Sequence, residues 1–244
     1  MIVIIGETHD DILYFDSVLA NKREETILGK YKISVGTIFS QDAIVASDLF
    51  TSSLSSAVLM HILDKYYVDL IISVGRCMYV GDNIKNGDII VSTKVIDANV
   101  DLTMFGDFAL GQIPGFDREF IVQDDIIGYI LKGLERRIAI TQHTATFLSS
   151  NNMSSQMVEV LNERKEIFSL KNELFVIDQN SAGVALASKL KDTPFIVVKV
   201  AENNLSAVDN LESYSAVLSK YIDLGKAVIS TINDISRSDI LEGN

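Results

Sequence analysis

Polar side chains that could bind or activate a small molecule follow four short apolar runs of this chain. The four groups are Glu7, His9, Asp10 and Asp11; Arg76; Asp178, Gln179 and Asn180; and Glu202, Asn203 and Asn204. Ligands of α/β sheets bind beyond the carboxyl ends of the strands, so four converging groups would make a polar pocket over an apolar floor. Any single group could also be a strand that simply ends in a polar loop. The four together favour a pocket.

Arg76 is the only basic residue among these groups. The apolar run at residues 70–72 shows no period-2 alternation, which predicts a strand buried on both faces. Gly75 is expected to end this strand, so that Arg76 lies in a polar loop at the pocket. A salt bridge to an acid such as Asp11 or Asp69 explains Arg76 equally well.

The spacing of apolar residues predicts the elements that position these groups. Strands are expected at residues 1–5, 70–72, 89–91, 138–141, 174–177 and 195–200, with an antiparallel meander of three short runs between residues 26 and 48. Helices are expected after Thr8 or Asp10 and at residues 51–67, 122–136, 153–165, 182–190 and 210–235. This alternation predicts one α/β domain over residues 1–244, a three-layer α/β/α fold with a central mixed β-sheet.

The composition excludes several classes of partner. The chain has 21 basic and 33 acidic residues, a net charge of −12, which repels nucleic acid and anionic membranes. No apolar run approaches the length of a membrane span, and the amino terminus lacks the pattern of a signal peptide. Cys77 is the only cysteine, so neither an internal disulfide nor a thiolate metal cluster can form. We expect a soluble, cytoplasmic protein.

Common catalytic motifs are absent from the sequence. It has no G-x-G-x-x-G, no Walker loop, no G-x-S-x-G and no H-E-x-x-H. His9, His61 and His143 are far apart; His61 falls in a helical pattern and His143 in an expected polar loop, so no metal site is predicted. No cofactor is expected either. The serines between Ser52 and Ser56 could hold an anion at a helix start, although helix capping explains them as well.

Five segments in a fixed order carry a resemblance to a known family. They are IVIIGETHDDI, VDLIISVG with NGDIIVS, VDLTMFGDFALGQIPG, LFVIDQNSAGVALAS and PFIVVKVAEN. In these segments the chain resembles the 5′-methylthioadenosine/S-adenosylhomocysteine nucleosidases of the nucleoside phosphorylase superfamily. The resemblance implies a mixed sheet flanked by helices and a homodimer in which Phe105 lines the partner's pocket. It also implies that Phe147 and Leu148 line the nucleoside site.

The family splits the bond between adenine and ribose with water, and the resemblance gives each reacting group a position here. The glutamate that activates water falls on Asp11, which is one methylene shorter. The Met-Glu pair that holds the ribose hydroxyls falls on Gln179 and Asn180. The acid that protonates the purine falls on Asn203, next to Glu202.

These differences leave two functions open. An Asn amide cannot donate a proton near neutral pH, and losing general acid catalysis typically costs about 10²- to 10⁴-fold in rate. The chain is then either a hydrolase of purine nucleosides with a changed substrate or rate, or a noncatalytic relative. The relative would bind a nucleoside-like or anionic molecule through Arg76, or serve as a structural dimer. Asp178 and Glu202 are the acids left to replace the missing ones. A phosphorylase is disfavoured, because Arg76 alone does not make a phosphate site.

Overall fold

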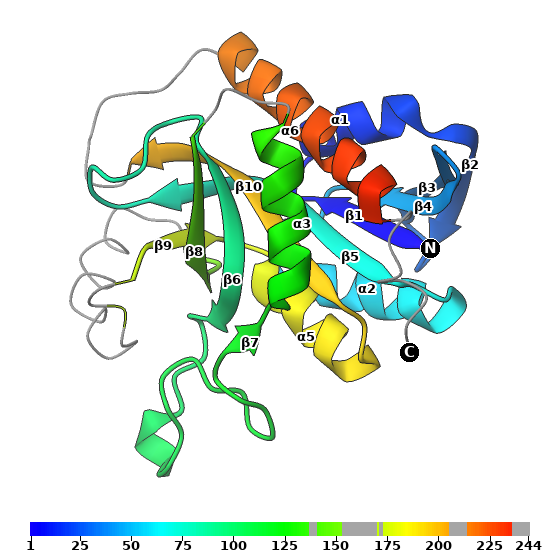
Figure 1. Ribbon diagram of the computed structural model, residues 1–244. Helices are drawn as coiled ribbons and strands as arrows, with labels where there is room; N and C mark the ends of the chain where they lie inside the picture. Colours follow the sequence, from blue (N-terminus) through cyan, green and yellow to red (C-terminus); the bar gives the residue numbers. More distant parts are fainter. Residues whose placement is uncertain (137–140, 153–169, 171–172, 205–213, 236–244) are drawn as a thin grey trace.

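The computed structural model describes residues 1–136, 141–152, 170, 173–204 and 214–235, without the side chains of residues 203–204, 214–218 and 233–235. The predicted helix at residues 153–165 lies outside this part of the chain. Within it, every strand belongs to one mixed sheet. Figure 1 shows the sheet with helices packed on it.

Most strands follow the apolar runs, whereas β2 is largely polar and exposed. Their bounds are β1 Ile2–Gly6, β2 Ala20–Ile27, β3 Tyr31–Ile38, β4 Gln41–Ala46, β5 Leu70–Tyr79, β6 Ile89–Asp97, β7 Phe120–Ile121, β8 Gln142–Ser149, β9 Phe175–Asp178 and β10 Phe195–Asn204. The predicted meander between residues 26 and 48 is confirmed, since β2, β3 and β4 pair antiparallel in succession.

Parallel pairing brings the predicted strand ends together. β1 pairs in parallel with β4 and β5, and β5 pairs in parallel with β10. Their carboxyl ends therefore share one edge of the sheet, which we call the carboxyl edge. β10 also pairs with β6, β6 with β8, β8 with β9, and β9 with β5. These five strands close into a ring beside the carboxyl edge.

The helices pack on the sheet in two groups. Their bounds are α1 His9–Val18, α2 Ser52–Lys65, α3 Asp124–Glu135, α5 Ser181–Lys191 and α6 Tyr214–Ile235, with a short 3-10 helix, η1, at Thr103–Phe105. α6 packs against α1 and α3, and Figure 1 shows α3 and α6 in front of the sheet. α2 packs against α5. The predicted three-layer α/β fold is confirmed. No helix in the described residues is long and apolar enough to cross a membrane.

One predicted strand was wrong in its bounds. Gly75 does not end β5: its φ of +139° bends the strand, and pairing with β10 and β9 continues to Tyr79. Arg76 therefore lies inside a strand and not in a loop. His143 lies in a strand and not in the expected polar loop, because β8 runs from Gln142 to Ser149. The strand expected at residues 138–141 lies, except for Thr141, outside the described residues. β8 lies between β6 and β9, which supply hydrogen bonds on both sides.

Candidate active site

The carboxyl edge is built around Lys199 of β10. This side chain has no solvent exposure, and its ammonium group contacts three oxygens. Nζ lies 2.5 Å from Glu7 Oε1, 2.5 Å from Asp178 Oδ2 and 2.8 Å from Asn180 Oδ1. An ammonium has three N–H donors, so these contacts use all of them. We call Glu7, Asp178, Asn180 and Lys199 the inner cluster.

Two predicted site residues are already engaged within the inner cluster. Asp178 Oδ1 accepts a hydrogen bond of 2.6 Å from Ser181 Oγ, and its Oδ2 accepts from Lys199 and the Ser181 backbone. Asp178 is thus held as the partner of a buried lysine and not as a spare acid. Asn180 gives its Oδ1 to Lys199 and donates from Nδ2 to the Leu49 carbonyl at 3.2 Å. Among the described residues, the second N–H of the Asn180 amide has no acceptor and could donate to a ligand.

The serines at the start of α2 hold this segment in place. Thr51 caps the helix, because its side chain accepts from the Leu54 backbone N–H. Ser52 Oγ donates to the Gln179 carbonyl at 3.1 Å, and Ser55 Oγ donates to the Asn180 carbonyl at 3.0 Å. The cap is therefore Thr51 and not one of the serines between Ser52 and Ser56, whereas Ser52 and Ser55 fix the backbone that carries the Asn180 amide.

Asp11 lies beside the inner cluster with one oxygen unused. Its Oδ2 accepts a hydrogen bond of 2.7 Å from the Thr8 backbone, which orients the carboxylate at the start of α1. Its Oδ1 is buried and has no hydrogen-bond partner among the described residues. A side chain on Gly75 would place its Cβ 3.2 Å from Oδ2, so the glycine keeps this carboxylate from being crowded. Asp11 can thus accept a hydrogen bond from a water or a hydroxyl.

Burial sets the charge balance of these groups. Burial raises the pKa of Glu7, and the attraction of Lys199 opposes this rise only in part. Burial likewise raises the pKa of Asp11, against the lowering effect of the Thr8 backbone hydrogen bond. For Lys199, burial works against the charge, but Asp178 and Glu7 outweigh it and raise the pKa of the ammonium. The carboxyl edge therefore holds carboxylates displaced toward the pKa range of acid–base catalysts.

Arg76 and Glu202 lie next to the inner cluster with Tyr221 of α6. Arg76 Nη1 lies 3.5 Å from Glu202 Oε2, and the Tyr221 hydroxyl donates to the same oxygen at 3.3 Å. Arg76 thus forms a salt bridge, as predicted, but its partner is Glu202 and not Asp11 or Asp69. Asp69 instead pairs with the amino group of Met1. The Arg76 side chain is 40% exposed, so it remains accessible to a ligand.

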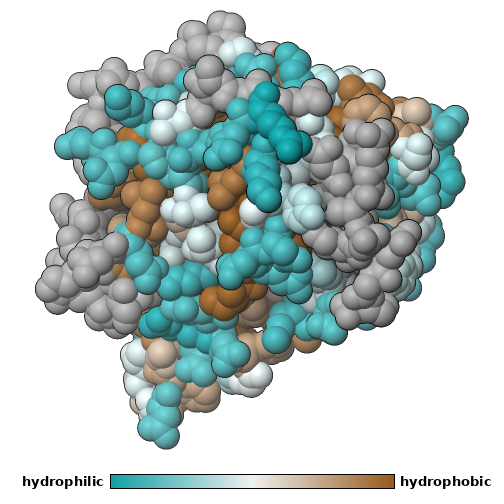
Figure 2. Space-filling model, viewed as in Figure 1, coloured by the Kyte–Doolittle hydropathy of each residue, from teal (hydrophilic) through white to brown (hydrophobic). Residues whose placement is uncertain are grey.

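The remaining predicted residues are scattered. Phe147 is fully buried in the main apolar core, and Leu148 is buried in a smaller cluster. Gln179 is half-buried beside the inner cluster. The side chain of Asn203 lies outside the described residues. Phe105 is 69% exposed on η1, in the projecting segment that shows both hydrophobic and hydrophilic surface in Figure 2.

The histidines are not gathered at this edge. His143 Nε2 lies 2.9 Å from Asp88 Oδ2, and His61 lies in α2 as predicted. Among the described residues, no group of three His, Cys, Asp or Glu side chains could hold a metal ion.

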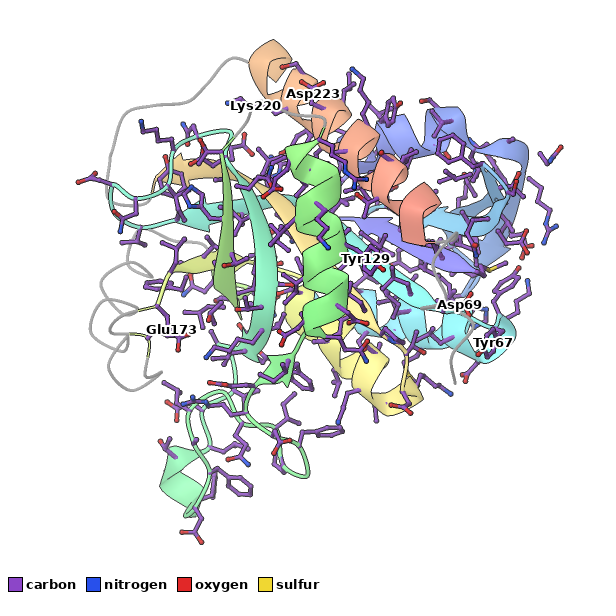
Figure 3. The ribbon with its side chains drawn as sticks, viewed as in Figure 1. Tyr67, Asp69, Tyr129, Glu173, Lys220 and Asp223 are labelled. Atoms are coloured by element: carbon purple, nitrogen blue, oxygen red, sulfur yellow. The ribbon has the colours of Figure 1, made fainter. Side chains whose placement is uncertain are left out.

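A cleft of about 750 Å³ lies at the opposite, amino edge of the sheet. Tyr67 and Asp69, which precede β5 and are labelled in Figure 3, line it together with Pro194 and Phe195 at the start of β10. Asp192 also lines it. None of the residues predicted to bind or react lines this cleft.

Lys199 is the functional residue that sequence reasoning missed. It lies inside the otherwise apolar run from Phe195 to Ala201. A lysine is almost never fully buried unless it is paired. A single cation in an apolar strand therefore signals buried acids nearby, and the acids at the ends of β1 and β9 were the available partners.

Comparison with known proteins agrees with this architecture. A family model described as the phosphorylase superfamily matches residues 1–232. The 5′-methylthioadenosine/S-adenosylhomocysteine nucleosidase of Buchnera aphidicola is 26% identical over 209 residues, covering 82% of this chain and 86% of the relative.

Two solved structures share the fold. The Neisseria meningitidis nucleosidase in complex with methylthio-immucillin-A superposes with a TM-score of 0.81 at 18% identity, covering 96% of this chain and 98% of the other. The Colwellia psychrerythraea nucleosidase in complex with adenine gives a TM-score of 0.79 at 20% identity, covering 95% and 94%. From its sequence match and its fold, the chain belongs to the phosphorylase superfamily.

Proposed function

We propose that this protein hydrolyses the N-ribosidic bond of purine nucleosides of the methylthioadenosine and adenosylhomocysteine type. Relatives that are named for that activity align with this chain over most of their length. Solved structures with the same fold bind adenine or a methylthio-immucillin. These likenesses support a nucleoside ligand at the carboxyl edge.

The observation that carries the proposal is the buried carboxylate of Asp11. Hydrolysis needs a group that accepts the proton of the attacking water or orients that water. Asp11 Oδ1 is buried without a donor, and a buried acceptor left unpaired typically costs about 1–3 kcal/mol. A water or hydroxyl that donates to Oδ1 removes this cost. Burial also raises the pKa of the Asp11 carboxyl above its ordinary value.

The Asn180 amide makes a weaker contact with a ribose hydroxyl than a carboxylate at this position would. Within the described part of the chain, Lys199 and the Leu49 carbonyl occupy the Asn180 amide except for one N–H. A neutral amide binds a hydroxyl less strongly than an ionised carboxylate. We therefore expect a higher KM than a glutamate at this position would give.

Release of adenine from methylthioadenosine tests the proposal directly. The wild-type protein and Asp11→Asn are compared, with Asp42→Asn as the matched control because Asp42 is exposed in β4. We expect Asp11→Asn to lower kcat by about 10²-fold or more and Asp42→Asn to leave it unchanged. Equal rates for the wild type and Asp11→Asn across a panel of purine nucleosides would refute the proposal.

A second candidate function is ligand binding without turnover. Two observations favour it: Lys199 already holds Asp178 and Asn180, and Arg76 reaches across to Glu202 beside them. Calorimetric titration with the same nucleosides separates the two functions. Micromolar binding together with no adenine release would support the second.

We further propose that the protein is a homodimer in which η1 packs against the partner. Met104 and Phe105 of η1 are 83% and 69% exposed, which is unusual for two large apolar side chains side by side. Sedimentation of the wild type and of Phe105→Ser tests this. We expect a dimer that is weakened by the substitution, whereas a wild-type monomer at all concentrations would contradict the proposal.

A further inference from the structure

Glu7 is a deeply buried acid to which neither the resemblance nor the proposed reaction gives a role. It lies at the carboxyl end of β1 with 3% exposure. Its Oε1 contacts Lys199, but Asp178 already supplies that lysine with a carboxylate at 2.5 Å. One buried lysine therefore faces two carboxylates, and Asp11 adds a third nearby. Two buried carboxylates on one ammonium leave one negative charge uncompensated, which is costly, so the second carboxylate suggests a role beyond the ion pair.

The backbone brings Asp11 close to Gly6, the residue before Glu7. A Cβ on Gly6, the residue before Glu7, would lie 2.9 Å from Asp11 Cβ. The Asp11 side chain therefore packs directly on the backbone that leads into Glu7. The negative charge of Asp11 also contributes to the raised pKa of Glu7, in agreement with this proximity.

Lys199 places Glu7 beside the residue at the ribose position. Glu7 Oε1 and Asn180 Oδ1 both lie within 2.8 Å of the same nitrogen atom. Among the described residues, the hydrogen bond that holds the Glu7 side chain involves Oε1. This contact leaves Oε2 as the acceptor that can turn toward a ligand bound between Asp11 and Asn180.

We propose that Glu7 is a catalytic residue of this site, the general base that takes the proton of the attacking water while Asp11 orients that water. This inference rests on the proposed hydrolase function. The water oxygen bonds to the anomeric carbon as the bond from that carbon to the purine nitrogen breaks. The electron pair of the broken bond moves to the purine, which takes a proton from solvent. Glu7 receives the water proton and later returns it to solvent.

The lengths of the two side chains explain this division. Asp11 is short, is fixed by the Thr8 backbone and lies against Gly75, so its carboxylate is recessed. Glu7 has one more methylene and is anchored only at Oε1 within the described residues. Lys199 keeps the Glu7 carboxylate ionised enough to accept a proton, while burial keeps it basic.

The test compares Glu7→Gln, which keeps shape and loses the charge, with Glu24→Gln on the exposed strand β2. We expect Glu7→Gln to lower kcat for adenine release by about 10²- to 10⁴-fold with little change in KM. Glu24→Gln should match the wild type. Titration with adenine checks folding, and its affinity should be unchanged in both variants.

Two further readouts separate a catalytic from a structural role. Sodium formate, a small external base, should restore at least tenfold of the lost rate in Glu7→Ala and none in the wild type. The acidic limb of the wild-type pH profile should disappear in Glu7→Gln. The charged groups around Glu7 from other elements are Lys199, Asp178, Asp11 and Arg76, and they are present in both proteins.

Each outcome decides the inference. A Glu7→Gln protein with kcat within threefold of the wild type overturns it and leaves the proposed hydrolase standing. A slow Glu7→Gln protein that has lost adenine binding, with no formate rescue of Glu7→Ala, also overturns it, because Glu7 is then structural. A wild-type protein that releases no adenine defeats both the inference and the proposed function.

Discussion

The two edges of the sheet differ in where their charges lie. At the carboxyl edge, Lys199 and Asp178 are fully enclosed and satisfy each other. At the amino edge, the roomy cleft is lined by Lys191, whose ion pair with Asp64 is exposed on both sides. Water screens the second pair and not the first, so burial raises the pKa of Glu7 at the carboxyl edge only. Volume alone would select the cleft as the site, whereas buried charge selects the carboxyl edge.

The largest difference between the edges should appear when each loses its lysine. Lys199→Met leaves Glu7 and Asp178 buried without a cation, which typically destabilises a fold by about 3–5 kcal/mol. Lys191→Met removes an exposed pair worth less than about 1 kcal/mol. Urea unfolding of both variants measures the two values. Similar losses in both would show that the contrast between the edges is not energetic.

A smaller effect is expected from the glycine that makes room for Asp11. Gly75→Ala forces a side chain into a φ of +139° and toward the Asp11 carboxylate, at a cost of about 1–3 kcal/mol. Gly128→Ala in α3 meets no atom within 4 Å and should stabilise the helix by about 0.5–1 kcal/mol. Thermal unfolding checks both directions. A neutral result for Gly75→Ala would mean that β5 can bend differently at this point.

The smallest expected effect is the pH dependence of the stability that two acids contribute, which should have opposite signs for the two. The pKa of Asp11 is raised above 3.8 by burial, so its contribution to stability is complete below that pH and is lost as pH rises through its raised pKa. The pKa of Glu25, which accepts hydrogen bonds from Lys65 and from Tyr66 at the cleft, is lowered from 4.5 to about 2. Its contribution is present above 4.5 and is lost as pH falls toward 2.

Variants that remove each charge should show these opposite slopes. The stability of the wild type relative to Asp11→Asn should fall as pH rises, whereas its stability relative to Glu25→Gln should fall as pH drops. Urea midpoints measured at several pH values give both curves. Parallel curves for the two variants would indicate that burial does not control the charge of Asp11.

The sequence predicted the convergence of polar groups better than the bounds of the strands. The runs before Glu7, Asp178 and Glu202 are apolar enough to be recognised, and parallel pairing then places their ends together. Gly75 was misleading, because a glycine can bend a strand as well as end one. Phe147 and Leu148 lie in a strand whose partners β6 and β9 come from distant segments, and local sequence carries no information on them.

Lys199 shows what single residues cannot reveal. Its position in an apolar run was visible, but its partners depend on which strands become neighbours. Likewise, Arg76 was expected to meet Asp11 or Asp69, and the pairing of β5 with β10 gave it Glu202 instead. The residue type predicts the chemistry of each group, whereas its partner depends on which strands pair in the sheet.

The contact between Glu7 and Lys199 also has a consequence for biosynthesis, because it joins residues 192 positions apart. During synthesis the amino-terminal acids leave the ribosome long before β10 does. Glu7 and Asp11 are therefore without the Lys199 ammonium while most of the other strands have already been synthesised. Contacts of such long sequence separation form late, since they close the largest loop. The position of β10 between β5 and β6 is what brings the ammonium of Lys199 to these acids. A nascent chain that ends before residue 195 carries the carboxylates of the site without the ammonium that makes their burial tolerable.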